Sequence, residues 1–296
     1  MAKASAVKIR DMLLADFWYP QDEDIARRQI QGYEQEQSSL LVHSLPLQTP
    51  VAGQEKLPSG KVHLMVLPHA AWDLVGPLLS RAFLYTRSTP YQHIILIGPS
   101  HDSREDGIFV SESDIFTTPL GPVRVDTDGI EEFASTSTLV TTNDILHLSE
   151  YSLEPLLPFI AYYFPDTPIV PVLTGKIPHW KSILALQRAL ELVMAGTNGE
   201  VLIIISCNFS SSQKELKEGS FAPLFAALEN HNEEALLTVV RSIPLEICGL
   251  PALLACLRLS FFSSLTMRVL GSLSVDGEEG GNFHYYHALV WEEPGT

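Results

Sequence analysis

The sequence of 296 residues contains few cysteines and few basic residues. Its three cysteines, Cys207, Cys248 and Cys256, are too few for a disulfide scaffold, so a reducing compartment is expected. Lys and Arg together number 19 against 35 Asp and Glu, which gives a formal net charge of −16. A surface this acidic repels phosphate backbones and anionic lipids. The composition therefore predicts no nucleic-acid partner and no membrane partner.

Long apolar runs are also absent. No stretch approaches the roughly 18 residues that a bilayer span needs, and the N-terminal residues contain no unbroken apolar segment typical of a signal peptide. The chain has no internal repeat, no CxxC pair and no HExxH helix motif. Because 46% of its residues are hydrophobic and recur in Val/Ile/Leu runs, disorder is excluded. These features are typical of a soluble cytoplasmic protein.

Short apolar runs alternate with segments of helical spacing after residue 60. Continuous apolar runs favour strands covered on both faces of a largely parallel sheet. The strands are predicted at Val62–Leu67, His93–Ile97, Ile169–Leu173 and Val201–Ile205, with a hairpin at Phe109–Val125 and a closing strand at His284–Trp291. The helices are predicted at Leu74–Tyr85, Tyr151–Phe164, Trp180–Met194 and Ala222–Val240.

This alternation predicts an α/β fold: a single three-layer domain over residues 1–296, with a mixed, mostly parallel central sheet and helices on both faces. The N-terminal residues 1–60 are expected to form a polar helix, Asp22–Glu36, and an extended segment that pack on this domain. Pro155 and Pro158 are expected to break or bend the helix predicted around them.

Chemically useful side chains follow several of the predicted strands. In an α/β sheet, ligands collect beyond the carboxyl ends of the strands. His69 and His101 follow two such ends, each beside small residues, so their rings are expected to converge. Two imidazoles with one thiolate or carboxylate would hold a metal ion and leave a position open. Cys248 precedes Gly249 and an apolar helix, and the simplest interpretation of this cysteine is a small buried hydrophobe.

Eight short motifs along the chain together resemble one family. They are ADFWYP at residues 15–20, LPHAAW at 67–72, IGPSH at 97–101, DIFTTPLG at 114–121, EYSLE at 150–154, IVPVL at 169–173, SCNFSS at 206–211 and ICGLP at 247–251. This order resembles the Memo family, whose microbial members are called AmmeMemoRadiSam system protein B. That family shares its fold with the LigB-like class III extradiol dioxygenases, so the resemblance implies the same fold here.

The resemblance implies a metal site with His69, His101 and Cys248 as ligands. It implies one iron or copper ion with an open coordination position and a metal-dependent activity of redox type. The residues expected to line the pocket are Glu150, Tyr151, Glu154, Asn208 and Ser211, and Glu154 or Tyr151 would orient a substrate. A small molecule or a peptide is the expected ligand. Protein partners from a three-component system associated with a radical-SAM enzyme are a further expectation.

Several positions depart from the family motifs. Asn208 stands in place of an aspartate, and Ser211 and Tyr151 stand in place of histidines suited to proton transfer. A second hypothesis is therefore a non-catalytic descendant that binds a ligand or a protein. A ring-cleaving dioxygenase would use two histidines and a carboxylate, so Cys248 in the carboxylate's place argues against that activity.

Overall fold

The computed structural model describes residues 6–40, 60–102, 106–175, 179–197, 200–212, 216, 218–275 and 282–295. Side chains are described throughout these ranges except at residues 37–40. Within these residues, no helix combines the length and apolar character that crossing a bilayer requires.

A large mixed sheet forms the centre of the fold. Its strand order is β11-β10-β13-β2-β9-β3-β8-β4-β7, and β12 pairs with β13 outside that path. The four strands β2, β9, β3 and β8 are parallel, whereas β10, β11, β12 and β13 join the sheet by antiparallel pairs. The main-sheet strands are β2 (Val62–Leu67), β3 (His93–Pro99), β4 (Ile108–Val110), β7 (Val140–Thr142), β8 (Ile169–Thr174), β9 (Val201–Ser206), β10 (Phe209–Ser211), β11 (Glu246–Ile247), β12 (Thr266–Val275) and β13 (Phe283–Glu292).

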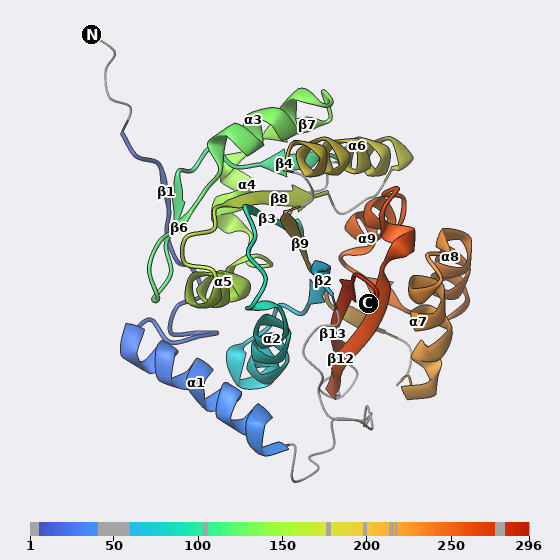
Figure 1. Cartoon of the computed structure of the whole chain (residues 1–296), viewed down its shortest axis with the longest axis horizontal. Helices are drawn as coiled ribbons and strands as arrows, with labels where there is room; N and C mark the ends of the chain where they lie inside the picture. The colour runs from blue at the N-terminus through green and yellow to red at the C-terminus, as the bar shows by residue number, and fades with distance from the viewer. Residues whose placement is uncertain are drawn as a thin grey trace.

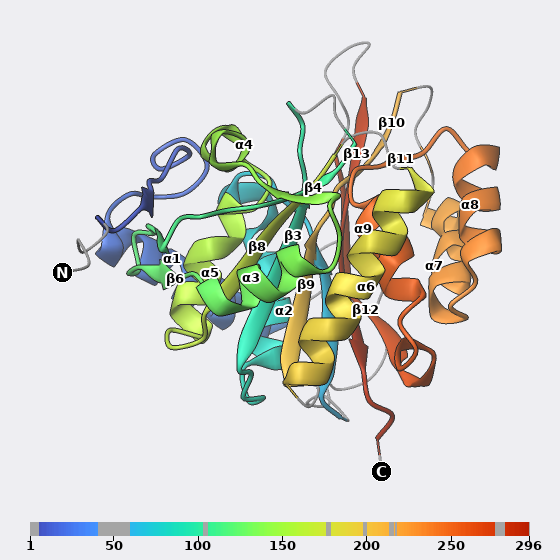
Figure 2. The ribbon, with the colours of Figure 1, turned by 90° about the horizontal axis from the view of Figure 1, so that it is seen from above.

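Helices cover both faces of this sheet. In Figure 1, α2 and α5 lie on one side of the central strands with α1 outside them, and α3, α6 and α9 lie on the other side. Figure 2 shows α7 and α8 together at one end of the molecule, next to the β10–β13 edge. The helices are α1 (Glu23–Leu40), α2 (Trp72–Thr86), α3 (Thr127–Ser135), α4 (Asp144–Ser149), α5 (Leu157–Tyr163), α6 (Trp180–Gly196), α7 (Ala222–Glu229), α8 (Glu233–Ser242) and α9 (Leu250–Leu257), with short 3-10 turns η1 (Glu154–Leu156), η2 (Glu218–Phe221) and η3 (Phe262–Ser264).

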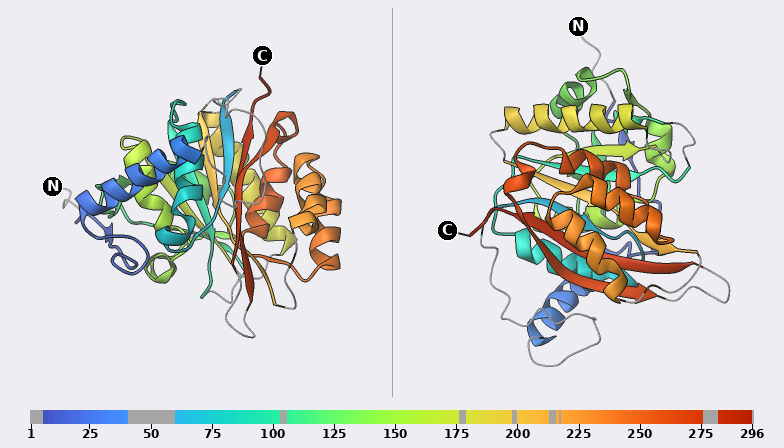
Figure 3. Two further views of the ribbon diagram at one scale, coloured as in Figure 1. Left: turned by 90° about the horizontal axis from the view of Figure 1, so that it is seen from below. Right: turned by 90° about the vertical axis from the view of Figure 1, so that its right-hand side faces the viewer.

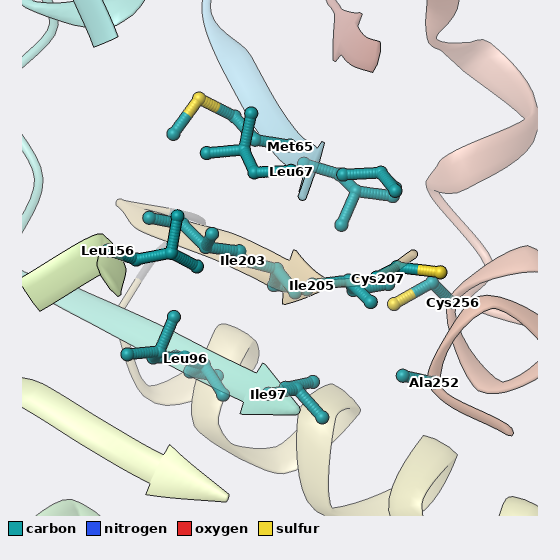
Figure 4. Packing of buried hydrophobic residues seen from close by; sticks show 14 of the residues in the cluster. Met65, Leu67, Leu96, Ile97, Leu156, Ile203, Ile205, Cys207, Ala252 and Cys256 are labelled. Carbon is teal, nitrogen blue, oxygen red and sulfur yellow. The ribbon is translucent and has the colours of Figure 1, made fainter. Parts of the chain in front are cut away.

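The core consists of the strand side chains and the helix faces packed on them. All six residues of β2, of β8 and of β9 are buried, which explains why these strands read as unbroken apolar runs. Figure 4 shows Ile203, Ile205 and Cys207 following one another along and just beyond β9, with Ala252 and Cys256 of α9 near its carboxyl end. The predicted mixed α/β class with helices on both faces is confirmed. The parallel part of the sheet is its centre, and antiparallel strands extend it at both sides.

Two predicted helices differ from the structure. The prediction of one helix over Ala222–Val240 is wrong, because the chain breaks it into α7 and α8 at His231, a residue with a φ of 52°. The segment around Pro155 and Pro158 forms the η1 turn followed by the shorter α5, as the two prolines lead one to expect. Within the predicted hairpin at residues 109–125, only β5 (Ile115–Phe116) and β6 (Val123–Arg124) pair as a hairpin.

The N-terminal segment contacts the sheet domain at two places. β1 (Ile9–Arg10) pairs with β5 in a small separate sheet. Further along, the hydroxyl of Tyr33 on α1 donates to the carbonyl of Trp72 at 2.9 Å. A Cβ at Gly76 would lie within 2.3–2.7 Å of the Tyr33 ring, so this contact requires a glycine on α2. Figure 3 shows α1 along one side of the molecule. The extended segment predicted before residue 60 lies largely outside the described residues.

Candidate metal centre

Three side chains from distant parts of the sequence meet at one edge of the sheet. His69 lies two residues beyond β2, His101 two residues beyond β3, and Cys248 directly after β11. One ligand atom of each lies within 4.8 Å of the corresponding atoms of the other two. The Cys248 Sγ is 4.0 Å from the His69 Nε2, and the two imidazole centroids are 5.3 Å apart. The convergence of the histidines follows from the parallel strands, whose carboxyl ends lie at the same edge.

A serine hydroxyl fixes the proton position on His69. The Ser206 hydroxyl donates to the carbonyl of Ser152 at 2.5 Å, and its oxygen lies 2.7 Å from the His69 Nδ1. Because a hydroxyl has one proton and that proton is used, Nδ1 must carry the hydrogen and donate it to Ser206. The Nε2 lone pair of His69 is therefore available to a metal ion. Such a second hydrogen bond is the usual way in which a ligating imidazole is oriented.

A buried carboxylate holds His101 in the same manner. Glu150 accepts hydrogen bonds from the His101 Nδ1 at 2.8 Å and from the His101 backbone amide at 2.6 Å. It also accepts from the backbone amides of Tyr151 and Ser152. Burial would raise the pKa of Glu150, but the hydrogen bonds and charge of His101 outweigh it and lower that pKa. Burial likewise opposes the charged form of His101, yet hydrogen bonds with Cys248 and Glu150 raise its pKa to about 9.

Backbone and thiol donors surround the Cys248 sulfur. The Asn208 backbone amide donates to Sγ at 3.0 Å. A hydrogen bond from the Cys207 thiol is the largest of the effects that lower the pKa of Cys248, and the nearby His69 and His101 add to it against the cost of burial. These contacts favour the thiolate, which is the form that binds metal ions. Burial raises the pKa of Cys207, so that sulfur stays protonated.

Asn208 acts on the backbone of His69. Its side-chain oxygen accepts from the His69 amide at 3.0 Å, and its side-chain nitrogen donates to the His69 carbonyl at 2.8 Å. Both ends of the amide are thus engaged in holding one metal-facing residue in place. The interpretation that follows is a positioning role for Asn208, because an amide cannot replace a carboxylate in proton transfer.

Tyr151 covers one face of His101. The two rings stack with centroids 4.4 Å apart and planes inclined by 12°. The Trp18 ring meets Tyr151 edge-on at 5.4 Å, so the N-terminal segment contributes to the wall of the site. Burial, followed by the nearby charges of Glu150 and Cys248, raises the pKa of Tyr151 to about 12. The phenol is therefore neutral near pH 7 and can donate a hydrogen bond, but it is not a base there.

The structure places the other two predicted pocket residues differently. Glu154 is fully buried, and its carboxylate accepts from Arg10, from the backbone amides of Leu13 and Leu14, and from the hydroxyl of Tyr19. That carboxylate anchors the N-terminal segment. Ser211 is buried on β10, where it pairs with Phe283 of β13.

Ser206, Ser152 and Trp18 belong to the surroundings of the site but were not among the predicted site residues. Ser206 ends β9 in register with Leu67, directly before the loop of His69. The sequence alone does not predict this contact, because the register depends on β2 and β9 being neighbours in the sheet. Trp18 lies far from the ligands in sequence, and only the folded N-terminal segment places it beside Tyr151.

Comparison with known proteins shows the family of the chain. The model of the Memo-like protein family matches residues 10–270. The chain belongs to the Memo-like family. Relatives described as MEMO1 family proteins include one from Pyrobaculum arsenaticum, 28% identical over 255 residues, which span 82% of this chain and 84% of the relative. A relative from Thermotoga neapolitana is 26% identical over 284 residues, covering 95% of this chain and 99% of its own length.

Among solved structures, an uncharacterized protein from Escherichia coli K12, JW3007, is 12% identical. The match covers 78% of this chain and 100% of that protein, with a TM-score of 0.48.

Two departures from the Memo motifs have clear backbone explanations. Asp16, in place of the motif glycine, has a φ of 64°, a conformation that aspartate tolerates better than most residues. Ala71, also in place of a glycine, has φ −57° and ψ 142°, which any residue adopts.

Proposed function

We propose that this Memo-family chain binds one iron or copper ion through the Nε2 atoms of His69 and His101 and the Sγ of Cys248, and uses it in a redox-type reaction. The observation that carries the proposal is that one ligand atom from each of the three side chains lies within 4.8 Å of the other two. Sulfur and imidazole nitrogen together suit iron and copper, and the thiolate disfavours harder ions such as Mg²⁺ and Ca²⁺.

The surroundings fit a metal ion on independent grounds. Both imidazoles donate their Nδ1 hydrogens to buried acceptors, Ser206 and Glu150, so Nε2 is the ring nitrogen that each offers to a metal ion. The pKa of His101 is about 9, so a metal ion that binds near pH 7 displaces the proton on its Nε2. Three protein ligands leave at least one coordination position for another molecule. An iron or copper ion held there would supply Lewis acidity and one-electron redox chemistry to a molecule at that position.

The chain's own residues would shape the space for that molecule. Tyr151 and Trp18 form an aromatic wall beside His101, and the neutral phenol of Tyr151 is a hydrogen-bond donor to a bound ligand. We propose a small molecule or a peptide as the ligand. The net charge of −16 disfavours an anionic ligand unless the bound metal ion balances its charge.

A second candidate function is ligand binding without catalysis. Two observations favour it. Both ends of the Asn208 side-chain amide bond to the His69 backbone, and Tyr151 is neutral near pH 7. Neither residue supplies the base that the family motif carries at its position. In this alternative the metal ion serves as a fixed anchor for a ligand or a partner protein.

Metal analysis of protein purified without an affinity tag tests the proposal. After loading with ferrous or cuprous ion and desalting, the wild-type chain should keep one ion per molecule. His69→Ala and Cys248→Ser should each lose it while the far-ultraviolet circular dichroism is unchanged. Matched controls are His179→Ala, at an exposed position before α6, and Cys256→Ser, within the α9 core. Equal metal content in all five proteins would refute the assignment.

Electron paramagnetic resonance separates the two candidate functions. A loaded metal ion that is reduced by ascorbate and reoxidised by air over repeated cycles supports the redox function. An ion that stays in one oxidation state under the same treatment supports the binding function.

A further inference from the structure

A second sulfur lies directly behind the proposed sulfur ligand. Cys207 follows the last residue of β9, and Cys248 follows β11; the pairing of Phe209 with Ile247 brings their two loops together. The Cys248 amide donates to the carbonyl of Asn208, next to Cys207, at 3.2 Å. The Cys207 thiol donates to the same Asn208 carbonyl at 3.7 Å, and the Asn208 backbone amide donates to the Cys248 sulfur at 3.0 Å. Both sulfur atoms thus contact the backbone of the same residue, Asn208.

Gly249 allows this close approach. Its amide donates to the Cys207 Sγ at 3.3 Å. A Cβ at this position would lie 2.8 Å from both the Cβ and the Sγ of Cys207. The residue after Cys248 therefore packs its bare backbone on the Cys207 side chain, which keeps the two cysteines adjacent.

The two sulfurs differ in their access to solvent. Cys207 is completely buried, whereas Cys248 is partly exposed at the open edge of the sheet. A small oxidant therefore reaches Cys248 first, and Cys207 is placed behind it as the second thiol. Cys256, the remaining cysteine, is completely buried in α9. The Memo-family motif that residues 206–211 resemble reads SSDFSH, with a serine at the position of Cys207, so the resemblance does not imply this cysteine pair.

We propose that Cys207 and Cys248 form a reversible disulfide when the protein meets a peroxide. The Cys248 sulfur attacks one oxygen of hydrogen peroxide, the O–O bond breaks, and water leaves, so that Cys248 becomes a sulfenic acid. The Cys207 sulfur then attacks the Cys248 sulfur, its proton goes to the departing hydroxide, and a second water leaves. In total two thiols lose two electrons and two protons to one peroxide, which becomes two waters.

The disulfide would remove a ligand from the metal centre. A disulfide sulfur carries no negative charge and is a poor ligand compared with a thiolate. This consequence rests on the proposed function, whereas disulfide formation itself does not. The pair would then release or exclude the metal ion under oxidising conditions and readmit it after reduction.

The disulfide is tested first on metal-free protein. One equivalent of hydrogen peroxide should lower the free thiols measured in denaturant from three per chain to one, and dithiothreitol should restore them. Proteolysis and mass spectrometry should find the Cys207 peptide joined to the Cys248 peptide. In Cys207→Ser the sulfenic acid on Cys248 should persist and be trapped by dimedone, whereas wild type should give little adduct. Cys256→Ser should form the same disulfide as wild type.

Other products would overturn the proposal. These are a disulfide joining Cys207 to Cys256, a disulfide between two chains, or oxidised Cys248 beside a Cys207 that remains a free thiol in wild type. Because serine stands at this position in the family motif, Cys207→Ser is expected to fold, and circular dichroism checks this.

Metal titration tests whether the disulfide weakens metal binding, and tests separately whether the reduced protein binds metal at all. Reduced wild type should bind one ferrous or cuprous ion, the peroxide-treated protein should bind it at least about tenfold more weakly, and dithiothreitol should restore binding. A disulfide that forms without any change in metal affinity would refute the proposed effect of the disulfide on the metal site. Reduced protein that binds no metal would refute the proposed function while the disulfide stands on its own measurement.

Discussion

The carboxylate of Glu154 offers a sharp test of how the N-terminal segment is held. It pairs with Arg10 at 2.5 Å, with both side chains almost completely buried. It also accepts from the amides of Leu13 and Leu14 at 2.7 Å each and from the Tyr19 hydroxyl at 2.6 Å. One side chain thus satisfies four donors from residues 10–19. Replacing Glu154 by glutamine keeps the shape but removes the charge and turns one acceptor into a donor.

The size of the effect follows from burial. Removing one partner of a buried ion pair costs about 3–5 kcal/mol, because the other charge remains desolvated. Arg10 keeps three backbone carbonyl acceptors, those of Asp11, His147 and Glu150, so the lower end applies. For a chain of 296 residues the unfolding entropy is about 0.6 kcal/mol per kelvin, and a loss of about 3 kcal/mol lowers Tm by about 5 °C.

Thermal unfolding of Glu154→Gln measures this shift. A matched control is Glu23→Gln, since Glu23 pairs with Arg27 on the exposed face of α1 and should cost only about 0.3–0.5 kcal/mol. Limited proteolysis of Glu154→Gln should cut first within residues 6–20, and metal content should stay at the wild-type value. A variant that keeps the wild-type Tm but loses its metal ion would show that Glu154 serves the site and not the segment.

Three further outcomes are expected. Ser206→Ala removes the acceptor that fixes the proton on His69, so metal affinity should fall about 10–100-fold in a titration. Gly249→Ala places a Cβ 2.8 Å from Cys207, and overpacking should cost about 1–3 kcal/mol in denaturant unfolding. Burial lowers the pKa of His147 to about 4 from an ordinary value near 6.5. Below pH 6.5 the unfolded chain protonates His147 while the folded chain keeps it neutral, so the free energy of unfolding decreases as the pH falls. The decrease reaches about 3 kcal/mol as the pH approaches 4, and none of it is present above pH 6.5.

Each of these outcomes has a control variant or a result that would contradict it. Ser210→Ala, on the neighbouring strand β10, should bind metal as wild type does. An unchanged unfolding midpoint in Gly249→Ala would contradict the close packing on Cys207. His147→Gln should flatten the dependence of unfolding free energy on pH between 6.5 and 4, and a curve as steep as wild type would reject His147 as its source.

The parallel centre of the sheet could be predicted from sequence because both of its faces are buried. In β2, β8 and β9 every residue is buried, so burial appears in the sequence as an unbroken apolar run. β12 was not predicted, since most of its residues are partly or fully exposed and the apolar run is interrupted. The break between α7 and α8 was missed too, because the positive φ of His231 carries no sequence signal as clear as a glycine.

In the candidate metal centre, too, some residues could be predicted from the sequence and others could not. His69 and His101 could be placed from strand ends alone, because parallel strands bring those ends together. Cys248 could not, since it follows β11, an antiparallel edge strand of two residues. Only the resemblance to the Memo motifs pointed to it. The contacts of Ser206 and Asn208 with His69 depend on strand order and loop geometry, which no residue pattern specifies.

X-ray absorption of the metal-loaded protein tests the central claim most directly. If His69, His101 and Cys248 hold the ion, the spectrum of wild type contains one sulfur neighbour together with imidazole scattering, and Cys248→Ser loses the sulfur contribution. A spectrum with only oxygen and nitrogen neighbours, the same in both proteins, would place the metal ion elsewhere and contradict the account.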